Sequence, residues 1–458
     1  MMLPIAFLLA LLVIAIQVTH KGIRAPERDE FAYLSIANDL NVHGVFSDGR
    51  FAEHKTVGAA EPGRFFAPAY PLFLYAMSSI SPATRVFVDC NAAEGTSQAN
   101  CPKAPILLLA VQAVMAALGM TCIFAASYLL SGSLVVAGLA EALALATGEP
   151  GYYVRTYLSE NTAFLGFYVF LASAVWAVAR NRLAGFALAG AALSFAALSR
   201  PSYLYLIYLA VLILATAAIL HPKLPIRWQQ LGAFVSTAFL VLAPWMLRNF
   251  WNFGDVALTS GYGGFILVQR VSYNSMTWTE WGVSLIAWLP DFGDSLARSL
   301  FPSDTYIRLG WDDPTSFYAI GNGQLMEETL AASGGRSGHL SYLLHNYVLA
   351  EPFKHLAVTL PLTLRGIWVG KYLALAATLL VIPVGREMAR RQCILPFLVL
   401  VMPPLLMAAF HALISVNVVR YNVPMIAPYA FIVAFSIVVI APRDIRWLRL
   451  FLFQRKGA

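Results

Sequence analysis

The sequence has few charged residues. Only 12% of its 458 residues are Asp, Glu, Lys or Arg, whereas soluble domains carry roughly 25%. So few charges cannot cover a soluble surface. Hydrophobic residues make up 59% of the chain, and they gather in blocks of about 15 to 25 residues, the length that crosses a bilayer core. The chain is therefore predicted to be an all-α integral membrane protein, and a soluble globular fold is excluded.

The sequence also lacks the patterns of several other protein classes. It has no CxxC pair and no His-rich spacing of the kind that binds zinc. His339 and His345 do not share a helical face, and no acid completes a metal site around them. No internal repeat is visible, which disfavours a transporter built from inverted repeats.

The net charge of +7 comes from Lys and Arg residues in short loops and near the C-terminus. This distribution is typical of the positive-inside bias and of contact with anionic lipid headgroups. We therefore expect membrane lipids, and no nucleic acid, as the partners of these charges.

Ten apolar runs are candidates for membrane-spanning helices. The first lacks a basic n-region and an A-x-A cleavage site, so we interpret it as a retained helix and not as a cleaved signal peptide. An even number of spans places both termini on one side of the membrane. The predicted spans are residues 2–19, 105–130, 132–148, 161–179, 183–199, 203–220, 231–247, 371–386, 393–413 and 424–441.

The positive-inside rule decides which side that is. With the N-terminus inside, the cytoplasmic loops and a basic tail at 442–458 contain many basic residues and few acids. We therefore expect a multi-pass protein of the plasma (inner) membrane with both termini in the cytoplasm. The basic residues concerned are Arg180, Arg182, Lys223, Arg227, Arg386, Arg390, Arg391, Arg443, Arg446, Arg449, Arg455 and Lys456.

Two long polar segments, 20–104 and 248–370, then lie outside, within a single polytopic domain, 1–458. Long loops in compact proteins are usually functional. Each segment contains a semi-apolar stretch, at 66–80 and 356–370, that is too short or too interrupted to be a clear span. We predict that these stretches form helices lying at the membrane interface.

The four cysteines are of two kinds. Cys122 and Cys393 lie in apolar spans, where a thiol behaves as a small hydrophobic group. Cys90 and Cys101 flank a polar stretch of the first external segment and can close a small loop, which requires an oxidising compartment. We predict a disulfide between them.

The most informative stretch, residues 25–40, reads APERDEFAYLSIANDL. Pro26 and the acids after it indicate the start of a helix. Asp29 and Tyr33 share the apolar face of that helix, so a carboxylate would be held beside the membrane surface. One interpretation is that Asp29 and Glu30 only satisfy the free N–H groups and the dipole of the helix. The other is that they carry chemistry.

The motif Asp29-Glu30-x-x-Tyr33-x-x-Ile36-Ala37, directly after a first span, resembles the first-loop motif of type-C (GT-C) glycosyltransferases. The branch is that of the lipid A aminoarabinose transferases and protein O-mannosyltransferases. At the next motif the family often has Lys before the prolines, where this chain has Arg64. Further segments resemble the family in order along nearly the whole chain: Arg64-Phe-Phe-Ala-Pro68-Ala-Tyr70-Pro71, Ser159-Glu160, Ser199-Arg200-Pro201, Ala243-Pro244-Trp245-x-x-Arg248-Asn249 and Arg420-Tyr421-x-x-Pro424.

The resemblance implies that a sugar is transferred from a polyprenyl-phosphate donor, with inversion, to a lipid, glycan or protein acceptor. Asp29 would be the general base that takes the proton of the acceptor hydroxyl, and Glu30 would tune it or hold the acceptor. The lipid phosphate is already a stable leaving group. A general acid is therefore less necessary than in glycoside hydrolysis, where two carboxylates share the work. The mechanism requires no cofactor, and a divalent metal near Asp29 is an open alternative.

Arginines suit the donor phosphate because their forked donors match its oxygens. Snorkelling to the membrane interface is the alternative role for the arginines at span ends. Glu160, which opens a span, can instead be an ion-pair partner of Arg155. The externally placed candidates are Arg64, Arg155, Arg200, Arg248, Arg270 and Arg420. Those predicted as phosphate ligands are Arg64, from its place in the motif, and Arg200, Arg248 and Arg420, from their place at the ends of spans. The residues predicted to line the substrate pocket are Tyr33, Tyr70 and Glu160.

The sequence thus predicts a membrane-embedded glycosyltransferase whose active site faces the outside, in bacterial terms the periplasm. The main alternative is a polytopic transporter or a flippase of lipid-linked glycans, which would need polar residues at mid-depth. The predicted spans contain few charges, and Glu141 is the main exception. A polymerase or ligase that uses a lipid-diphosphate donor is disfavoured by the Asp29-Glu30 motif.

Overall fold

The computed structural model describes residues 2–51, 60–92, 100–220 and 227–441. The predicted basic tail lies outside the described residues. The chain divides into two compact units. It passes between them after Leu258, within α19 (Tyr372–Arg390), within α20 (Ile394–Ile414) and after Met425. Unit 1 comprises Met1–Leu258, Ala376–Met402 and Ile426–Ala458, and unit 2 comprises Thr259–Leu375 and Pro403–Met425.

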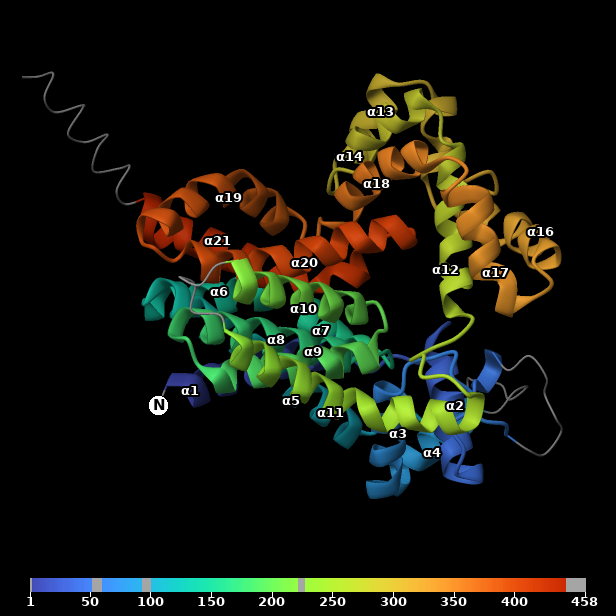
Figure 1. The fold of residues 1–458 in the computed structure, drawn as a ribbon, viewed down its shortest axis with the longest axis horizontal. Coiled ribbons are helices and arrows are strands. Elements are labelled where there is room, and N and C mark those ends of the chain that lie inside the picture. Colours follow the sequence, from blue (N-terminus) through green and yellow to red (C-terminus); the bar gives the residue numbers. More distant parts are fainter. Residues whose placement is uncertain (1, 52–59, 93–99, 221–226, 442–458) are drawn as a thin grey trace, which may run out of the picture. The chain divides into compact units, whose positions relative to one another are not determined.

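The described residues are helical or irregular and contain no strand (Figure 1). The helices that lie wholly in unit 1 are α1 (Met2–Lys21), α2 (Glu30–His43), η1 (Gly49–Phe51), α3 (Ala69–Ile80), α4 (Pro82–Ala92), α5 (Ile106–Ser131), α6 (Leu134–Ala146), α7 (Glu149–Val154), α8 (Glu160–Arg180), α9 (Leu183–Ser199), α10 (Tyr203–Leu220), α11 (Trp228–Phe253), α21 (Ile426–Phe435) and η8 (Ser436–Ile440).

Unit 2 is built from shorter helices. They are α12 (Tyr262–Val271), η3 (Ser272–Ser275), α13 (Trp278–Ala287), α14 (Gly293–Leu300), η4 (Ser303–Thr305), η5 (Ile307–Leu309), α15 (Phe317–Asn322), α16 (Gln324–Ala332), α17 (Arg336–Leu343), η6 (Leu344–Val348), α18 (Pro352–Gly366) and η7 (Val419–Met425). The two helices that run from one unit into the other are α19 (Tyr372–Arg390) and α20 (Ile394–Ile414).

Within the described part of the chain, eight helices are long and apolar enough to cross a membrane. They coincide with eight of the ten predicted spans: α1, α5, α8, α10, α11, α19, α20 and the stretch Val419–Ile440 that contains α21. The other two predicted spans form α6 and α9, of 13 and 17 residues. Both are shorter than the roughly 20 residues that cross a bilayer core. The structure is thus all-helical, with eight candidate spans by length and composition.

Both semi-apolar stretches of the long polar segments form helices. The stretch 66–80 contains α3, and the stretch 356–370 overlaps α18. α6 ends early because Gly148 adopts a φ of 76°, a left-handed conformation that glycine enters without steric cost. The short helix α7 follows this turn.

Small residues let the helices of unit 1 approach closely. α8 packs against α9, and α9 packs against α11. A Cβ added to Gly190 would lie 2.2 Å from the backbone oxygen of Phe234 in α11, and one added to Gly166 would lie 2.9 Å from the backbone nitrogen of Ala196. Glycine at these two positions therefore sets the helix spacing, as in many helix pairs in membranes.

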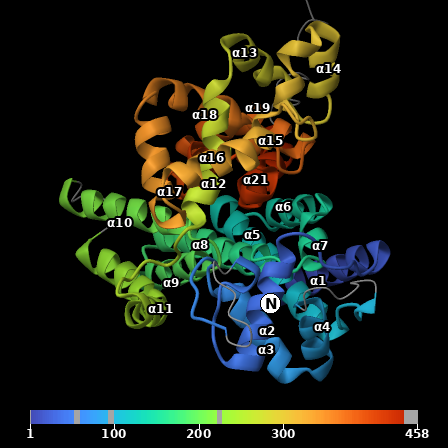
Figure 2. The ribbon, with the colours of Figure 1, turned by 90° about the vertical axis from the view of Figure 1, so that its right-hand side faces the viewer.

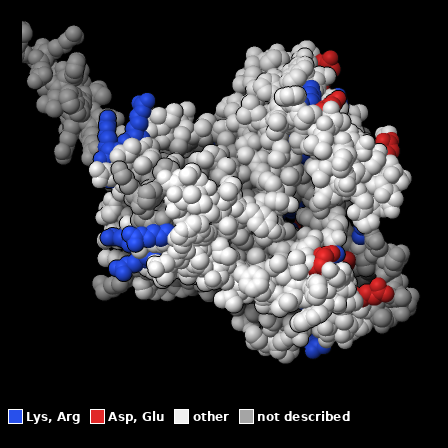
Figure 3. Space-filling view, viewed as in Figure 1, with Lys and Arg blue, Asp and Glu red and all other residues white. Residues whose placement is uncertain are grey.

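One end of unit 1 is rich in positive charge. α1 begins and the α21–η8 helix ends at this end of the unit (Figure 1). Figure 3 shows Lys and Arg side chains gathered there. By sequence, the turn from α8 to α9 carries Arg180 and Arg182, and the C-terminal end of α19 and the residue after it carry Arg386, Arg390 and Arg391.

The described residues of the first long polar segment include three α-helices that contact one another, α2, α3 and α4 (Figure 2), and the short helix η1, which contacts α2. Buried side chains join these helices to the start of α5 and to the segment before α8. This hydrophobic cluster includes Leu34, Tyr70, Phe87, Leu108 and Tyr157. The segment that contains the Asp29-Glu30 motif is therefore fixed to the helix bundle of unit 1.

Candidate active site

Glu30 anchors the segment that leads into α2. It is 1% exposed, and its carboxylate pairs with Arg24. It also accepts hydrogen bonds from the backbone N–H groups of Glu27, at 2.9 Å, and Tyr157, at 3.2 Å. Burial raises the pKa of Glu30 to about 7, while Arg24 and the two N–H groups act in the opposite direction. Glu30 thus ties residues 24–30 to the segment before α8, and its oxygens are used within the protein.

Asp29, its neighbour, is exposed. It occupies the N-cap position of α2, but its side chain makes no capping hydrogen bond within the described residues. The residue before it, Arg28, has a φ of 47°, which is uncommon for a residue with a side chain. The geometry therefore gives no support to a capping role. An exposed carboxylate beside a fixed anchor is suited to accept a proton from a bound acceptor.

Tyr33, one turn along α2, connects the motif to the start of α8. Its hydroxyl donates to Ser159 Oγ at 3.1 Å, and its ring packs edge-on against Tyr70 with centroids 5.5 Å apart. Tyr70 is fully buried and donates from its hydroxyl to Gln112 Oε1 at 2.8 Å. Burial raises the pKa of Tyr33, and the charge of Glu160 adds to this effect. Tyr33 and Tyr70 thus lie together, as part of one packed wall.

Glu160 begins α8 and is 1% exposed. It forms an ion pair with Arg200, at the C-cap of α9, with 2.9 Å between Oε1 and Nη2. The alternative partner considered from the sequence, Arg155, instead donates to the backbone oxygen of Gly22 at 3.4 Å. The adjoining ends of α8 and α9 are therefore joined, close to Tyr33, by an ion pair with a buried carboxylate and a half-buried guanidinium.

Arg248, near the end of α11, holds the first polar segment to the bundle. Its guanidinium donates to the backbone oxygens of Gly63, at 2.7 Å, and Phe46, at 2.8 Å. The same guanidinium lies 4.7 Å from the ring centroid of Trp245. These contacts give Arg248 a structural role, in addition to any contact with substrate.

Arg64 is engaged by an acid that the sequence did not nominate. Its guanidinium forms a two-pronged ion pair with Asp255, in which Nη2 and Oδ2 are 2.8 Å apart. It also lies 4.4 Å from the ring centroid of Phe253. The hydrogen bonds from Arg64 lower the pKa of Asp255. A donor phosphate would therefore compete with Asp255 for the forked donors of Arg64.

Arg420, the last predicted phosphate ligand, belongs to unit 2 and lies on η7. Its guanidinium is 5.5 Å from the ring centroid of Tyr421. The structure thus gathers Asp29, Glu30, Tyr33, Tyr70, Glu160 and Arg200 around the starts of α2 and α8. It places Arg64 and Arg248 together at the end of α11, and Arg420 in the other unit.

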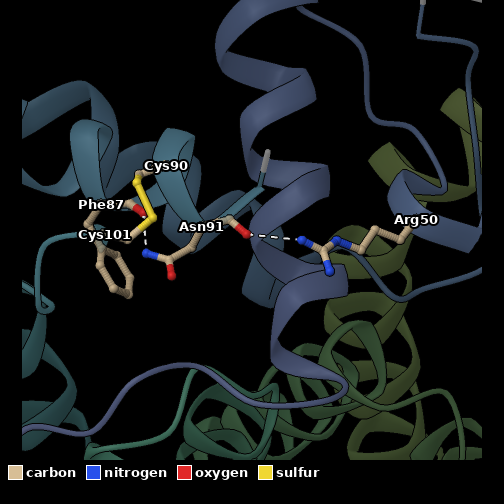
Figure 4. Close-up of a disulfide and its surroundings, with 5 residues drawn as sticks. All are labelled: Arg50, Phe87, Cys90, Asn91 and Cys101. Atoms are coloured by element: carbon tan, nitrogen blue, oxygen red, sulfur yellow. Dashed lines mark hydrogen bonds between the residues drawn. A yellow bond between two sulfur atoms is a disulfide. The ribbon is translucent and has the colours of Figure 1, made fainter. Parts of the chain in front are cut away.

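Cys90 and Cys101 form a disulfide with their Cα atoms 5.7 Å apart (Figure 4). Cys90 lies on α4, and Cys101 lies in the segment before α5. The neighbouring residue Asn91 donates to Phe87 O at 2.8 Å and accepts at its backbone oxygen from Arg50 at 3.2 Å. The disulfide and these bonds fix the C-terminal end of α4.

Sequence reasoning missed two residues of this region. Arg24, the partner of Glu30, also donates from Nε to the backbone oxygen of Arg155 at 3.2 Å. Asp255, the partner of Arg64, follows α11 by two residues. Arg24 lies six residues before Glu30 on a non-helical stretch, so no helical spacing indicated the pair. The opposite charges of the paired residues were the only feature of the sequence that pointed to these ion pairs.

Among the described residues, no group of three or more His, Cys, Asp or Glu side chains is arranged to hold a metal ion. No protein-family model matches this chain, and no curated protein matches it either.

Proposed function

We propose that this chain is a membrane-embedded glycosyltransferase that moves a sugar from a polyprenyl-phosphate donor to an acceptor at the outer face of the membrane. The observation that carries the proposal is the contrast within the Asp29-Glu30 pair. Glu30 is buried and engaged on both oxygens, whereas Asp29 is exposed beside it on a fixed segment. One acid thus positions the other.

In the proposed reaction, Asp29 accepts the proton of the acceptor hydroxyl while the hydroxyl oxygen attacks the anomeric carbon of the sugar. The bond from that carbon to the phosphate oxygen breaks, and polyprenyl phosphate leaves with the bonding electrons. Attack opposite the leaving group inverts the anomeric centre. Cationic groups stabilise the phosphate as its charge grows. Tyr33 and the Glu160–Arg200 pair would form the wall against which the sugar or acceptor binds.

A cellular experiment tests this proposal. A strain that lacks the gene should lose one envelope glycan modification and accumulate the matching lipid-linked sugar, both measured by mass spectrometry. The wild-type gene should restore the modification, and Asp29→Asn should not. The matched control is Glu27→Gln, which removes an acid whose side chain is 68% exposed on the same segment. Full rescue by Asp29→Asn would refute the proposed role.

The proposal also places both termini in the cytoplasm and the Asp29 segment outside. Single cysteines, introduced after Cys122 and Cys393 are replaced by Ser, should react with an impermeant thiol reagent at Ser333 and resist it at Gln229 and Gln392. All three positions are on described loops or helix ends. Labelling of Gln229 from outside would reverse the orientation.

The transporter alternative has one observation in its favour. Glu141 lies in α6, is 5% exposed, and has one carboxylate oxygen without a hydrogen-bond partner among the described residues. A buried acid in a membrane helix is often part of a transport pathway. Glu141→Gln distinguishes the two functions, since it should abolish transport but leave sugar transfer intact.

A further inference from the structure

A groove runs along α1 on the surface of unit 1. Residues of α1, α5 and α6 line it, and its volume is about 520 Å³. The α1 residues that line it recur every three or four positions, on one helical face, from Met2 to Gln17. Apart from Gln17 at one end and Glu141 in the middle, the described lining residues are apolar or glycine.

A second pocket of about 410 Å³ begins where the groove ends, and Gln17 lines both. Gln17 is fixed between them because it donates to Leu145 O at 2.8 Å and accepts from the N–H of Gly151 at 3.2 Å. The described lining of this pocket contains the basic residues His20, Lys21 and Arg155 and the single acid Glu149. A positive pocket thus adjoins one end of an apolar groove.

This combination matches a lipid with an anionic head and a long chain. Arginine and lysine are the usual ligands of phosphate. A phosphate monoester carries about −1.5 to −2 charges at neutral pH. Its electrostatic attraction to the basic residues of this pocket is therefore stronger than that of a singly charged phosphodiester. The charge of the pocket therefore favours a lipid monophosphate.

The length of the groove favours an isoprenoid chain. At 1.5 Å per residue, the α1 face from Met2 to Gln17 is about 22 Å long. Half of a bilayer core is only about 15 Å thick, which is the depth that an ordinary acyl chain of one leaflet reaches. An occupant that starts at the basic pocket and fills the groove must be longer than such a chain.

We propose that the groove and the basic pocket bind the polyprenyl phosphate carrier, with the chain along α1 and the phosphate against Lys21 and Arg155. This inference rests on the proposed function for the identity of the lipid. The pocket is close in sequence to the proposed reaction site, because α1 ends at the pocket residue Lys21 and α2 begins at Glu30. Arg155 binds the backbone of Gly22 in the connecting segment, and its own backbone oxygen accepts from Arg24, the partner of Glu30. Phosphate binding would therefore be linked to the position of Asp29.

Two substitutions test the chain and the head separately. Gly138→Leu should obstruct the groove without a steric clash, since a Cβ at Gly138 meets no described atom within 4 Å. Its control is Gly232→Leu, which adds the same side chain to α11 at a position that is equally open. Lys21→Gln removes charge from the pocket, and its control is Lys103→Gln, an exposed lysine outside it.

Binding is measured by native mass spectrometry on the purified full chain, with undecaprenyl phosphate, geranyl phosphate or phosphatidylglycerol as the probe. Gly138→Leu and Lys21→Gln should each lower the affinity for undecaprenyl phosphate by at least about tenfold, which corresponds to about 1.4 kcal/mol of binding free energy. Gly138 lies nine residues, or about 13 Å, along the chain from the pocket residue Thr147, so Gly138→Leu should leave the short geranyl phosphate unaffected. Both controls should bind like the wild type.

The outcomes separate this inference from the proposed function. If wild-type protein binds undecaprenyl phosphate but neither variant weakens it, the carrier binds elsewhere and the groove assignment is wrong. If wild-type protein prefers phosphatidylglycerol, the groove holds a structural phospholipid and the inference fails. If it does not bind undecaprenyl phosphate at all, the proposed function fails as well. Glu141→Leu removes the one acid from the groove lining, so the affinity for undecaprenyl phosphate should stay the same or rise. A loss of affinity in this variant would indicate that the ligand has a polar group in the groove, which would contradict an isoprenoid chain.

Discussion

Unit 1 and unit 2 both contain arginines with little exposure, but the charges meet different partners. In unit 1, Arg24 and Arg200 are half-buried, with side chains 22% and 15% exposed. Around the starts of α2 and α8, Arg24 and Arg200 pair with the buried acids Glu30 and Glu160. In unit 2, Arg270 is fully buried and donates to the backbone oxygens of Ala412 and His355, both at 2.7 Å.

The difference indicates where chemistry is to be expected. Arg270 meets neutral acceptors, which is a packing arrangement that joins α12 to α18 and α20. The unit 1 region brings several ionisable groups together and leaves one of them, Asp29, exposed. Sites with coupled charges and an accessible acid are typical of catalysis. Substitutions in the two units test this division, and their expected effects run from large to small.

Breaking the Glu160–Arg200 pair should have the largest effect on stability. Glu160→Leu leaves the charge of Arg200 without its partner at a site where that side chain is 15% exposed. We expect a loss of about 3–5 kcal/mol in the free energy of unfolding. The double variant Glu160→Leu/Arg200→Met removes both charges and should recover most of this loss. Thermal unfolding in detergent measures both, and a double variant as unstable as the single one would contradict the ion-pair account.

Removal of the Cys90–Cys101 disulfide should cost about 3 kcal/mol, because the bond closes a short loop and restricts the unfolded chain. Cys90→Ser/Cys101→Ser is compared with Cys393→Ser, a free cysteine, in the same unfolding measurement. The control should be close to wild type. A double variant with wild-type stability would show that the hydrophobic cluster alone holds α4.

Arg270→Met should cost about 1–3 kcal/mol, the effect of leaving a buried hydrogen-bonding group unsatisfied. The loss of stability from Glu160→Leu can be reversed by a second substitution, but the loss from Arg270→Met cannot. Arg270 donates to backbone oxygens, which no substitution removes. Sugar transfer, measured per folded molecule, should be unchanged. Loss of transfer in protein that remains folded would move part of the active site into unit 2.

Arg64→Ala should have the smallest effect. The Asp255 side chain is 51% exposed, and ion pairs with an exposed partner contribute at most about 1 kcal/mol. If the carrier phosphate binds at Lys21 and Arg155, as we propose, the affinity of Arg64→Ala for undecaprenyl phosphate should also be unchanged. A tenfold weaker affinity in Arg64→Ala, absent in Asp255→Asn, would restore the phosphate role that the motif gives to Arg64.

Much of the helix pattern could be predicted from the sequence, because each apolar run is a local signal. The ten predicted spans all form helices. The bounds are less exact: α6 ends at Ala146, before the left-handed Gly148, whereas the predicted span runs to residue 148. The spacing of Cys90 and Cys101 was likewise a local signal, since two cysteines near each other in a polar loop can meet without knowledge of the fold.

The pairing of charges could not be predicted in the same way. Glu160 and Arg200 are 40 residues apart, and only the packing of α8 on α9 brings their ends together. Arg64 and Asp255 are 191 residues apart. The groove along α1 depends on how α1 packs against α5 and α6, which hydrophobic periodicity does not specify. The sequence therefore nominated the acids as a group but did not indicate which of them is buried against an arginine.

The most direct test of the central claim is a transfer assay with purified protein. Wild-type chain in nanodiscs is incubated with a polyprenyl-phosphate sugar and an envelope extract as the acceptor source, and the release of free polyprenyl phosphate is followed by mass spectrometry. We expect acceptor-dependent release that falls by at least about 10²-fold in Asp29→Asn and is retained in Glu27→Gln. No release above the protein-free background, across the available lipid-linked sugars, or equal release by Asp29→Asn and wild type, would contradict the account.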